Sequence, residues 1–137
     1  MRKTFSEDLY TEMSEDEKIY FILGDVGFGF FDKLKKDFPD RVINPGASEQ
    51  LMMGMASGMA MDGFKPIVYS ITPFILFRPF EFIRNFLNED KLAVKIVGVG
   101  RDKDYGALGF THFATDDEII SNSFENIKIY KPKDDSD

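Results

Sequence analysis

The chain has 137 residues and a mass of 15.7 kDa, which fits one domain of ordinary size and leaves no room for a second. With 43% hydrophobic and 15% aromatic residues it has enough apolar side chains to fold, while its net charge of -7 argues against binding to nucleic acid or to an anionic membrane. It contains no cysteine and no apolar run approaching the roughly 18 residues of a membrane span, so we expect a cytoplasmic protein without disulfides.

Helical and strand patterns alternate along the chain. One apolar stripe, Phe5, Leu9 and Met13, predicts a short first helix. The other predicted helices cover residues 31–38, 51–61, 81–88 and 116–121. The predicted strands cover residues 19–23, 41–44, 67–71, 93–99 and 127–130. Ser48 is expected to cap the helix over 51–61, and a charged tail is expected from about residue 132.

This alternation predicts an α/β fold, with a mostly parallel sheet and helices on both faces. Ligands of such sheets bind beyond the carboxyl ends of the strands. Here those ends fall at Gly24 with Asp25, at 44–49, at 72–77 and at 100–112. We therefore expect the functional residues to gather along that edge.

Several common site motifs are incomplete. A near match to the phosphate-binding loop over 58–63 has Phe64 where lysine is required, and Gly24, Gly27 and Gly29 invert the spacing of the dinucleotide fingerprint. One histidine without cysteine cannot form a conventional zinc site or a recognisable catalytic triad. A nucleotide cofactor, a metal site on this chain and triad chemistry all lose their support.

A glutamate stands where a helix rich in small residues is expected to start. Glu49 precedes Gly54, Ser57, Gly58 and Ala60, which would let another backbone approach closely, while methionines fill irregular apolar space. The simpler interpretation is a buried helix whose first-turn carboxylate is favoured by the helix dipole. By itself the glutamate does not decide between these alternatives.

Four segments in order carry a resemblance that covers nearly the whole chain. They are Gly24-Asp-Val-Gly27, Glu49-Gln50, the segment Phe74-Ile-Leu-Phe-Arg-Pro-Phe-Glu-Phe-Ile-Arg84, and Tyr105-Gly-Ala-Leu-Gly-Phe-Thr-His112. Together they resemble the pyrimidine-binding domain of transketolase and deoxyxylulose-phosphate synthase. The resemblance implies thiamine diphosphate as cofactor, with the aminopyrimidine ring held at an interface between subunits or domains.

The resemblance also implies catalytic roles for two residues. Glu49 matches the glutamate that hydrogen-bonds a ring nitrogen of the aminopyrimidine and favours the tautomer that deprotonates the thiazolium carbon; proton transfer of this kind contributes about 10² to 10⁴ in rate. His112 matches the histidine of a Gly-x-Thr-His signature that faces sugar hydroxyls. Phe110 departs from that signature, where proline is usual, and so puts the shape of the loop in question. A lone histidine can equally be structural.

Further cofactor contacts are implied at four positions. Phe74 and Phe77 both lie where the family has an aromatic platform for the pyrimidine, and the resemblance does not choose between them or exclude a plain core role. Asp25 aligns with an acidic residue near the cofactor, although an aspartate in a glycine turn commonly bonds nearby backbone. Arg78 either organises the site or belongs to a surface charge network at helical spacing.

The family's diphosphate-binding features are missing from this sequence. Relatives hold Mg²⁺ and the phosphates with a Gly-Asp-Gly triplet followed by an Asn pair, and neither occurs here. A C-terminal transketolase domain is also not seen. We therefore expect a split enzyme for ketol transfer on sugars or sugar phosphates, in which a separate diphosphate-binding subunit carries Mg²⁺ in a hetero-oligomer, expected to be a heterotetramer. The alternatives are a non-catalytic binding or assembly module and a subunit of a keto acid decarboxylase.

Overall fold

The computed structural model describes residues 1–118 and 122–134. In this part of the chain one sheet contains four parallel strands in the order β2-β1-β3-β4. The strands are β1 (Ile19–Leu23), β2 (Val42–Ile43), β3 (Lys65–Ile71) and β4 (Lys95–Val99). All three strand pairings are parallel, which confirms the α/β fold predicted from the sequence.

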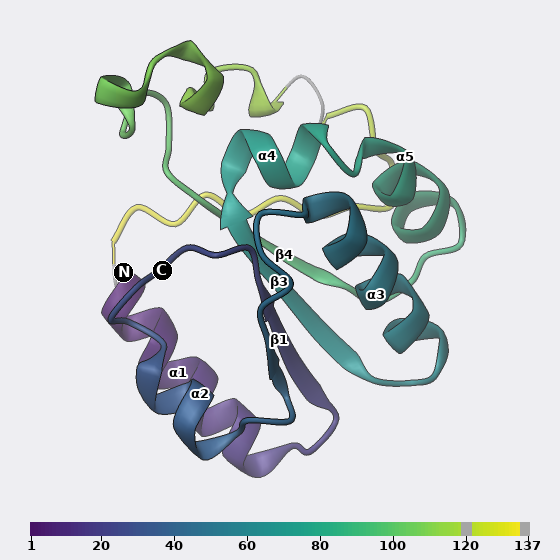
Figure 1. Ribbon diagram of the computed structural model, residues 1–137. Helices are drawn as coiled ribbons and strands as arrows, with labels where there is room; N and C mark the ends of the chain where they lie inside the picture. Colours follow the sequence, from purple (N-terminus) through teal and green to yellow (C-terminus); the bar gives the residue numbers. More distant parts are fainter. Residues whose placement is uncertain (119–121, 135–137) are drawn as a thin grey trace.

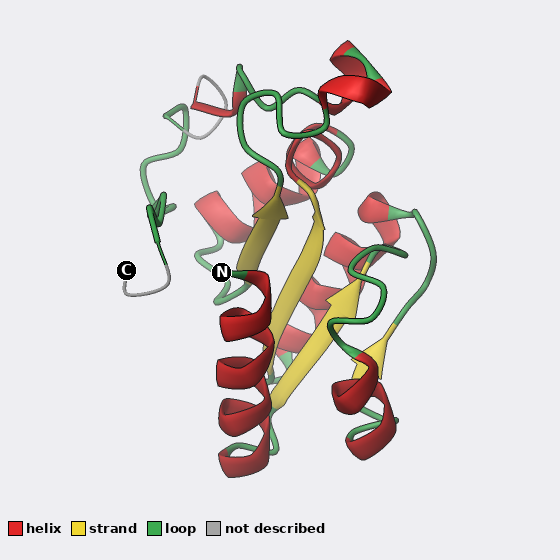
Figure 2. Ribbon diagram, turned by 90° about the vertical axis from the view of Figure 1, so that its left-hand side faces the viewer, coloured by secondary structure: helices red, strands yellow, loops and turns green. Residues whose placement is uncertain are grey.

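Helices cover both faces of this sheet (Figures 1 and 2). The first face carries α1 (Arg2–Glu15) and α2 (Asp32–Asp37), and the second carries α3 (Glu49–Met61), α4 (Thr72–Phe77), α5 (Phe80–Phe82) and the π-helical turn η1 (Ile83–Glu89). Two short 3₁₀ turns, η2 (Gly106–Leu108) and η3 (Phe110–His112), lie in the loop after β4. No helix in the described ranges is long and apolar enough to cross a membrane.

Strand β3 separates two apolar layers because successive side chains point to opposite faces. Ile67 and Tyr69 pack in the layer beneath α1 and α2, whereas Val68 packs in the layer beneath α3 and η1. Ser70 is the next residue to face α3, and it is fully buried at the carboxyl end of the strand. The alternation of β3 therefore delivers one hydroxyl group to the helix that begins with Glu49.

The helix α4 was not predicted from the sequence. It begins directly after β3, and Pro73 lies in its first turn, where a missing N–H is tolerated. The side chain of Thr72 donates to the carbonyl of Gly100 at 2.7 Å and so ties the start of α4 to the end of β4. A Cβ atom on Gly98 would lie 2.7 Å from the Thr72 hydroxyl, so the absence of a side chain there permits this close approach.

The predicted final strand over 127–130 is wrong. The described residues of this segment lie outside the four-stranded ladder, although Ile127 packs on the layer beneath α3. The segment is attached through Asn126, whose backbone N–H donates to the side-chain oxygen of Asn88 at 3.0 Å. A short apolar pattern predicts burial, but here only Ile127 is partly buried, while Ile129 and Tyr130 are 43% and 80% exposed.

The remaining element predictions hold with shifted ends. The helix predicted over 81–88 is divided between α5 and η1, and the strand predicted over 93–99 begins at Lys95. Ser48 does occupy the N-cap of α3, but its hydroxyl donates to the carbonyl of Pro45 and makes no capping bond. Of the helix predicted over 116–121, two residues are helical and 119–121 lie outside the described residues.

Candidate functional site

Glu49 lies at the first position of α3, just beyond the carboxyl end of β2. Its side chain is only 1% exposed, which is uncommon for a carboxylate unless it is paired. Two donors satisfy it from different elements. The Ser70 hydroxyl donates to Oε1 at 2.8 Å, and the Arg78 guanidinium donates from Nη1 to Oε2 at 2.6 Å.

Arg78 connects the carboxylate to the aromatic part of the site. Its guanidinium carbon lies 3.9 Å from the centre of the Phe74 ring, within the range of a cation–π contact. The Phe74 ring in turn meets the His112 ring edge-on, with 4.8 Å between ring centres. The structure therefore brings four of the residues predicted from the sequence, Glu49, Phe74, Arg78 and His112, into one connected group.

The loop after β4 positions the imidazole of this group. The side-chain oxygen of Thr111 lies 3.1 Å from Nδ1 of His112, and the Tyr105 ring centre lies 6.2 Å from that of His112. Gly100, with a φ of 87°, allows Tyr105 to pack against the backbone where the loop leaves the strand. His112 is partly buried.

A surface depression of about 720 Å³ opens above Glu49. It is lined by the first residues of α3 and by Arg78: Ala47, Ser48, Glu49, Gln50, Leu51 and Arg78. Arg78 is 46% exposed and separates the carboxylate from solvent. The carboxylate is thus buried within the chain but lies directly beneath the surface.

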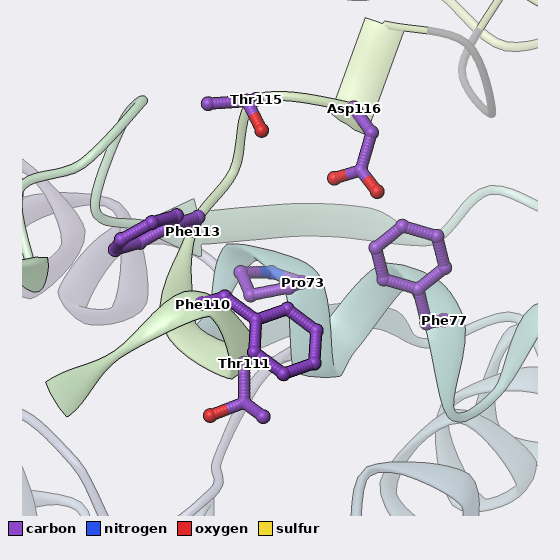
Figure 3. Close-up of a pocket in the computed structure, with 7 residues that line it drawn as sticks. All are labelled: Pro73, Phe77, Phe110, Thr111, Phe113, Thr115 and Asp116. Carbon is purple, nitrogen blue, oxygen red and sulfur yellow. The ribbon is translucent and has the colours of Figure 1, made fainter.

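Phe77 does not line this depression. It is 43% exposed and borders a second pocket of about 350 Å³, which Figure 3 shows between α4 and the loop after β4. That pocket is lined by Pro73, Phe77, Phe110, Thr111, Phe113, Thr115 and Asp116. Of the two candidate platform residues, Phe74 is the one in contact with the Glu49 group.

Asp25 stands at the end of the neighbouring strand in a left-handed conformation, with a φ of 54°. Its backbone N–H and carboxylate both bond the side chain of Asn44, at 3.2 Å and 3.3 Å. The same Asn44 oxygen accepts the N–H of Gly46 at 3.0 Å. These bonds connect the ends of β1 and β2, and within the described residues no hydrogen bond or ion pair joins Asp25 to the Glu49 group.

Two polar residues important to the arrangement were missed in the sequence. Ser70 holds Glu49, and Asn44 joins the two strand ends. A serine facing inward within the apolar strand 67–71 was an available signal for the first. For the second, the asparagine in front of Pro45 could equally have been an ordinary turn residue.

Tyr69 and Ser70 are neighbours in β3 whose side chains face opposite sides of the sheet. Adjacent to Ser70 but on the opposite face, it is 2% exposed, and its ring stacks on Phe5 at 5.9 Å. Its hydroxyl has no hydrogen-bond partner in the part of the chain that is described. Burial raises the pKa of Tyr69 above its usual value.

The fold and the site together define a class of protein. It is a parallel α/β domain with a buried glutamate at the carboxyl edge of its sheet. A family model described as "Transketolase, pyrimidine binding domain" matches residues 1–137. The chain belongs to this family, which places it among the domains of thiamine diphosphate-dependent enzymes and confirms the resemblance found in the sequence.

Individual relatives include a transketolase subunit and a synthase. A subunit of the apulose-4-phosphate transketolase of Actinobacillus succinogenes is 34% identical over 97 residues, covering 71% of this chain and 31% of that protein. The 1-deoxy-D-xylulose-5-phosphate synthase of Bacillus cereus is 32% identical over 133 residues, covering 96% of this chain and 21% of that protein. The chain spans less than half of the length of these relatives.

A solved structure agrees with the same family. The protein described as "Split gene transketolase, inactive beta4 tetramer" superposes with a TM-score of 0.76 at 29% identity. The superposition covers 90% of this chain and 39% of that one. The likeness extends over almost the whole described domain.

Proposed function

We propose that this chain forms the pyrimidine-binding half of a thiamine diphosphate site in a transketolase-like enzyme. Its proposed reaction is ketol transfer on sugars or sugar phosphates, and its partner is a diphosphate-binding subunit that also holds Mg²⁺. When bound, thiamine diphosphate supplies a nucleophilic thiazolium carbon that adds to a carbonyl group. The apulose-4-phosphate transketolase relative, which is named as one subunit of its enzyme, supports a divided enzyme.

One observation carries this proposal: a planar, nitrogen-bearing group already fits against Glu49. The Arg78 guanidinium donates to the carboxylate while it lies over the Phe74 ring. An aminopyrimidine is also planar, and it presents ring nitrogens at its edge. The residues present therefore fit the group that the family binds.

Each residue of the connected group then has a defined task. Ser70 fixes Oε1 of Glu49, so that Oε2 is the oxygen that holds a proton opposite a ring nitrogen. Phe74 provides a surface for stacking, a contact worth about 1–3 kcal/mol for nucleic-acid bases. His112 lies across the Phe74 ring, where it can bond a hydroxyl group of the substrate.

Exposed apolar side chains support a partner at this edge. Each of the four strands is followed by a connection carrying a large apolar side chain that is at least 43% exposed: Phe28, Leu51, Phe77 and Phe110. Phe77 and Phe110 line one pocket, and Leu51 lines the depression above Glu49, so exposed apolar side chains accompany both hollows of this edge. A partner that completes the cofactor site would cover it, which agrees with the expected hetero-oligomer.

Substitution of Glu49 by glutamine tests the proposal in the assembled enzyme. We expect ketol-transfer turnover to fall by a factor of about 10² to 10⁴, because the amide of glutamine cannot exchange a proton with the ring nitrogen. Circular dichroism should show an intact fold. Glu12→Gln, at an exposed glutamate of α1, is the matched control and should keep full turnover.

Near-normal turnover of Glu49→Gln would refute the assignment. Calorimetric titration of thiamine diphosphate and Mg²⁺ into the chain, the partner and their mixture tests the shared site. We expect strong binding only by the mixture, whereas full turnover by the chain alone would exclude a divided site. A mixture that binds no cofactor would favour the non-catalytic assembly role.

A further inference from the structure

Arg78 makes the two contacts with Glu49 and Phe74 at the same time. Its Nη1 donates to Oε2 of Glu49 at 2.6 Å, and its guanidinium carbon is 3.9 Å from the centre of the Phe74 ring. A planar cation is thus stacked on an aromatic ring while its edge meets a buried carboxylate. These are the contacts assigned above to the aminopyrimidine ring of the cofactor.

Two planar groups cannot occupy one position. We propose that Arg78 is a placeholder: without cofactor, in the free subunit and in the complex with its partner, its guanidinium fills the pyrimidine position, and it moves outward when the cofactor binds. This inference rests on the proposed function, because it takes Glu49 and Phe74 as the pyrimidine contacts. It adds that the affinity for the cofactor is set by competition with a residue of this chain.

The surroundings of Arg78 allow such a movement. Its side chain is 46% exposed and borders the open depression above the start of α3. It follows the last residue of α4, a helix of only six residues, and precedes Pro79. Departure of the guanidinium therefore requires rotation of one half-exposed side chain and no opening of the core.

The carboxylate keeps its place when Arg78 leaves. Ser70 is fully buried and holds Oε1 at 2.8 Å independently of the arginine. The freed Oε2 then faces the depression. An unpaired buried carboxylate is costly, so the placeholder also protects the empty site until a ring nitrogen replaces the guanidinium.

Cofactor affinity of an arginine variant tests the competition. The measurement uses the complex of this chain with its diphosphate-binding partner, with Mg²⁺ present. Arg78→Met should lower the calorimetric Kd for thiamine diphosphate by about fivefold to tenfold, because no guanidinium then competes for the pyrimidine position. Arg84→Met is the matched control, since the Arg84 guanidinium donates to the side-chain oxygen of Asn85 at the surface. The Kd of this variant for thiamine diphosphate should equal that of the wild type.

A spectroscopic measurement follows the side chain itself. In the ¹⁵N-labelled wild-type chain within the complex, the Arg78 Nε–H signal should report a restrained group without cofactor. On saturation with thiamine diphosphate it should move to the position and exchange rate of a solvent-exposed arginine, while the Arg84 signal stays unchanged. A purely structural arginine would keep its signal.

The possible outcomes separate the two proposals. Suppose first that the wild-type complex binds the cofactor. If the Arg78→Met complex then binds it equally or more weakly, or if the Arg78 signal stays restrained on saturation, the placeholder is excluded and the proposed function stands. If the wild-type complex binds none, the proposed function fails and this inference with it. Should Arg78→Met not fold, Arg78→Lys keeps the charge without the planar surface and should still tighten binding, by a smaller factor.

Discussion

Ser70 determines which oxygen of Glu49 is available for chemistry. It is fully buried, and its hydroxyl lies close to Gly24. A Cβ atom on Gly24 would lie 3.0 Å from the Ser70 oxygen and 3.0 Å from the Met52 sulfur. The glycine at the end of β1 therefore leaves the space in which the serine holds the carboxylate.

Removal of the Ser70 hydroxyl should destabilise the domain. Ser70→Ala leaves Oε1 of Glu49 without its donor, so we expect the free energy of unfolding to fall by about 1–3 kcal/mol in a urea titration. Ser57→Ala is the control, because that buried hydroxyl bonds the Met53 carbonyl within its own helix and adds little. Equal losses in the two variants would contradict a special role for Ser70.

At the scale of elements, α3 has two glycines in different surroundings. A Cβ atom on Gly54 would lie 3.2 Å from the Phe82 ring of α5, so the missing side chain lets these two elements pack closely. A Cβ atom on Gly58 would meet no atom of the described residues within 4 Å, and the residue is exposed. The close approach expected from the sequence is thus made within the chain at Gly54, by a side chain, and not at Gly58.

Alanine substitution should separate the two positions. Gly58→Ala should raise the free energy of unfolding of the isolated chain by about 0.5–1 kcal/mol, because glycine is a poor helix former and there is open space for the methyl group. Gly54→Ala should not give this gain, since the Phe82 ring must shift. Thermal and urea unfolding of both variants measures the difference, and equal stabilisation would show that Phe82 does not constrain Gly54.

At the scale of the whole molecule, ion pairs connect elements far apart in sequence. Asp16, which ends α1, bonds Lys65 at the start of β3 with 2.7 Å between the charged atoms. The hydrogen bond from Lys65 lowers the pKa of Asp16 below its ordinary value of 3.8, and the one to Asp16 raises the pKa of Lys65. The pair therefore favours the folded state only while the carboxylate is ionised.

Acid should weaken the domain through this pair. The folded pKa of Asp16 is lowered, so its contribution is complete above the unfolded value of 3.8 and is lost as the pH falls through the folded value. We expect Asp16→Asn to flatten the fall of stability below about pH 4, and Asp8→Asn, an exposed aspartate of α1, to leave it unchanged. Urea midpoints between pH 2 and 6 measure this, and identical profiles would contradict it.

Much of the architecture could be predicted because its signals are local. The apolar run over 19–23 coincides with β1, and the stripe of Phe5, Leu9 and Met13 lies on the inner face of α1. Such patterns reflect the period with which neighbouring side chains reach one face. Glu49 was singled out by the family resemblance, whereas the helix start on which it lies could be predicted from short-range features.

Other features could not be predicted, because they depend on contacts between distant residues. Ser70 and Arg78 reach Glu49 across 21 and 29 residues, and those distances are closed by the strand order and by the docking of α4 on β4. Helix α4 itself follows a strand without any connecting turn, and the segment 127–130 neither pairs with a strand nor buries more than Ile127. Local apolar patterns do not distinguish these cases.

The sequence by itself determined the α/β class and the edge of the sheet at which function was expected, and its family resemblance implied the candidate residues Glu49, His112, Phe74, Phe77, Asp25 and Arg78. Only the tertiary structure decided that Glu49, Phe74, Arg78 and His112 form one group, that Phe77 borders a separate pocket, and that an arginine covers the carboxylate. The physical reason is that burial and hydrogen bonding depend on side chains brought together by the packing of sheet and helices, whereas local periodicity encodes only which face each side chain takes.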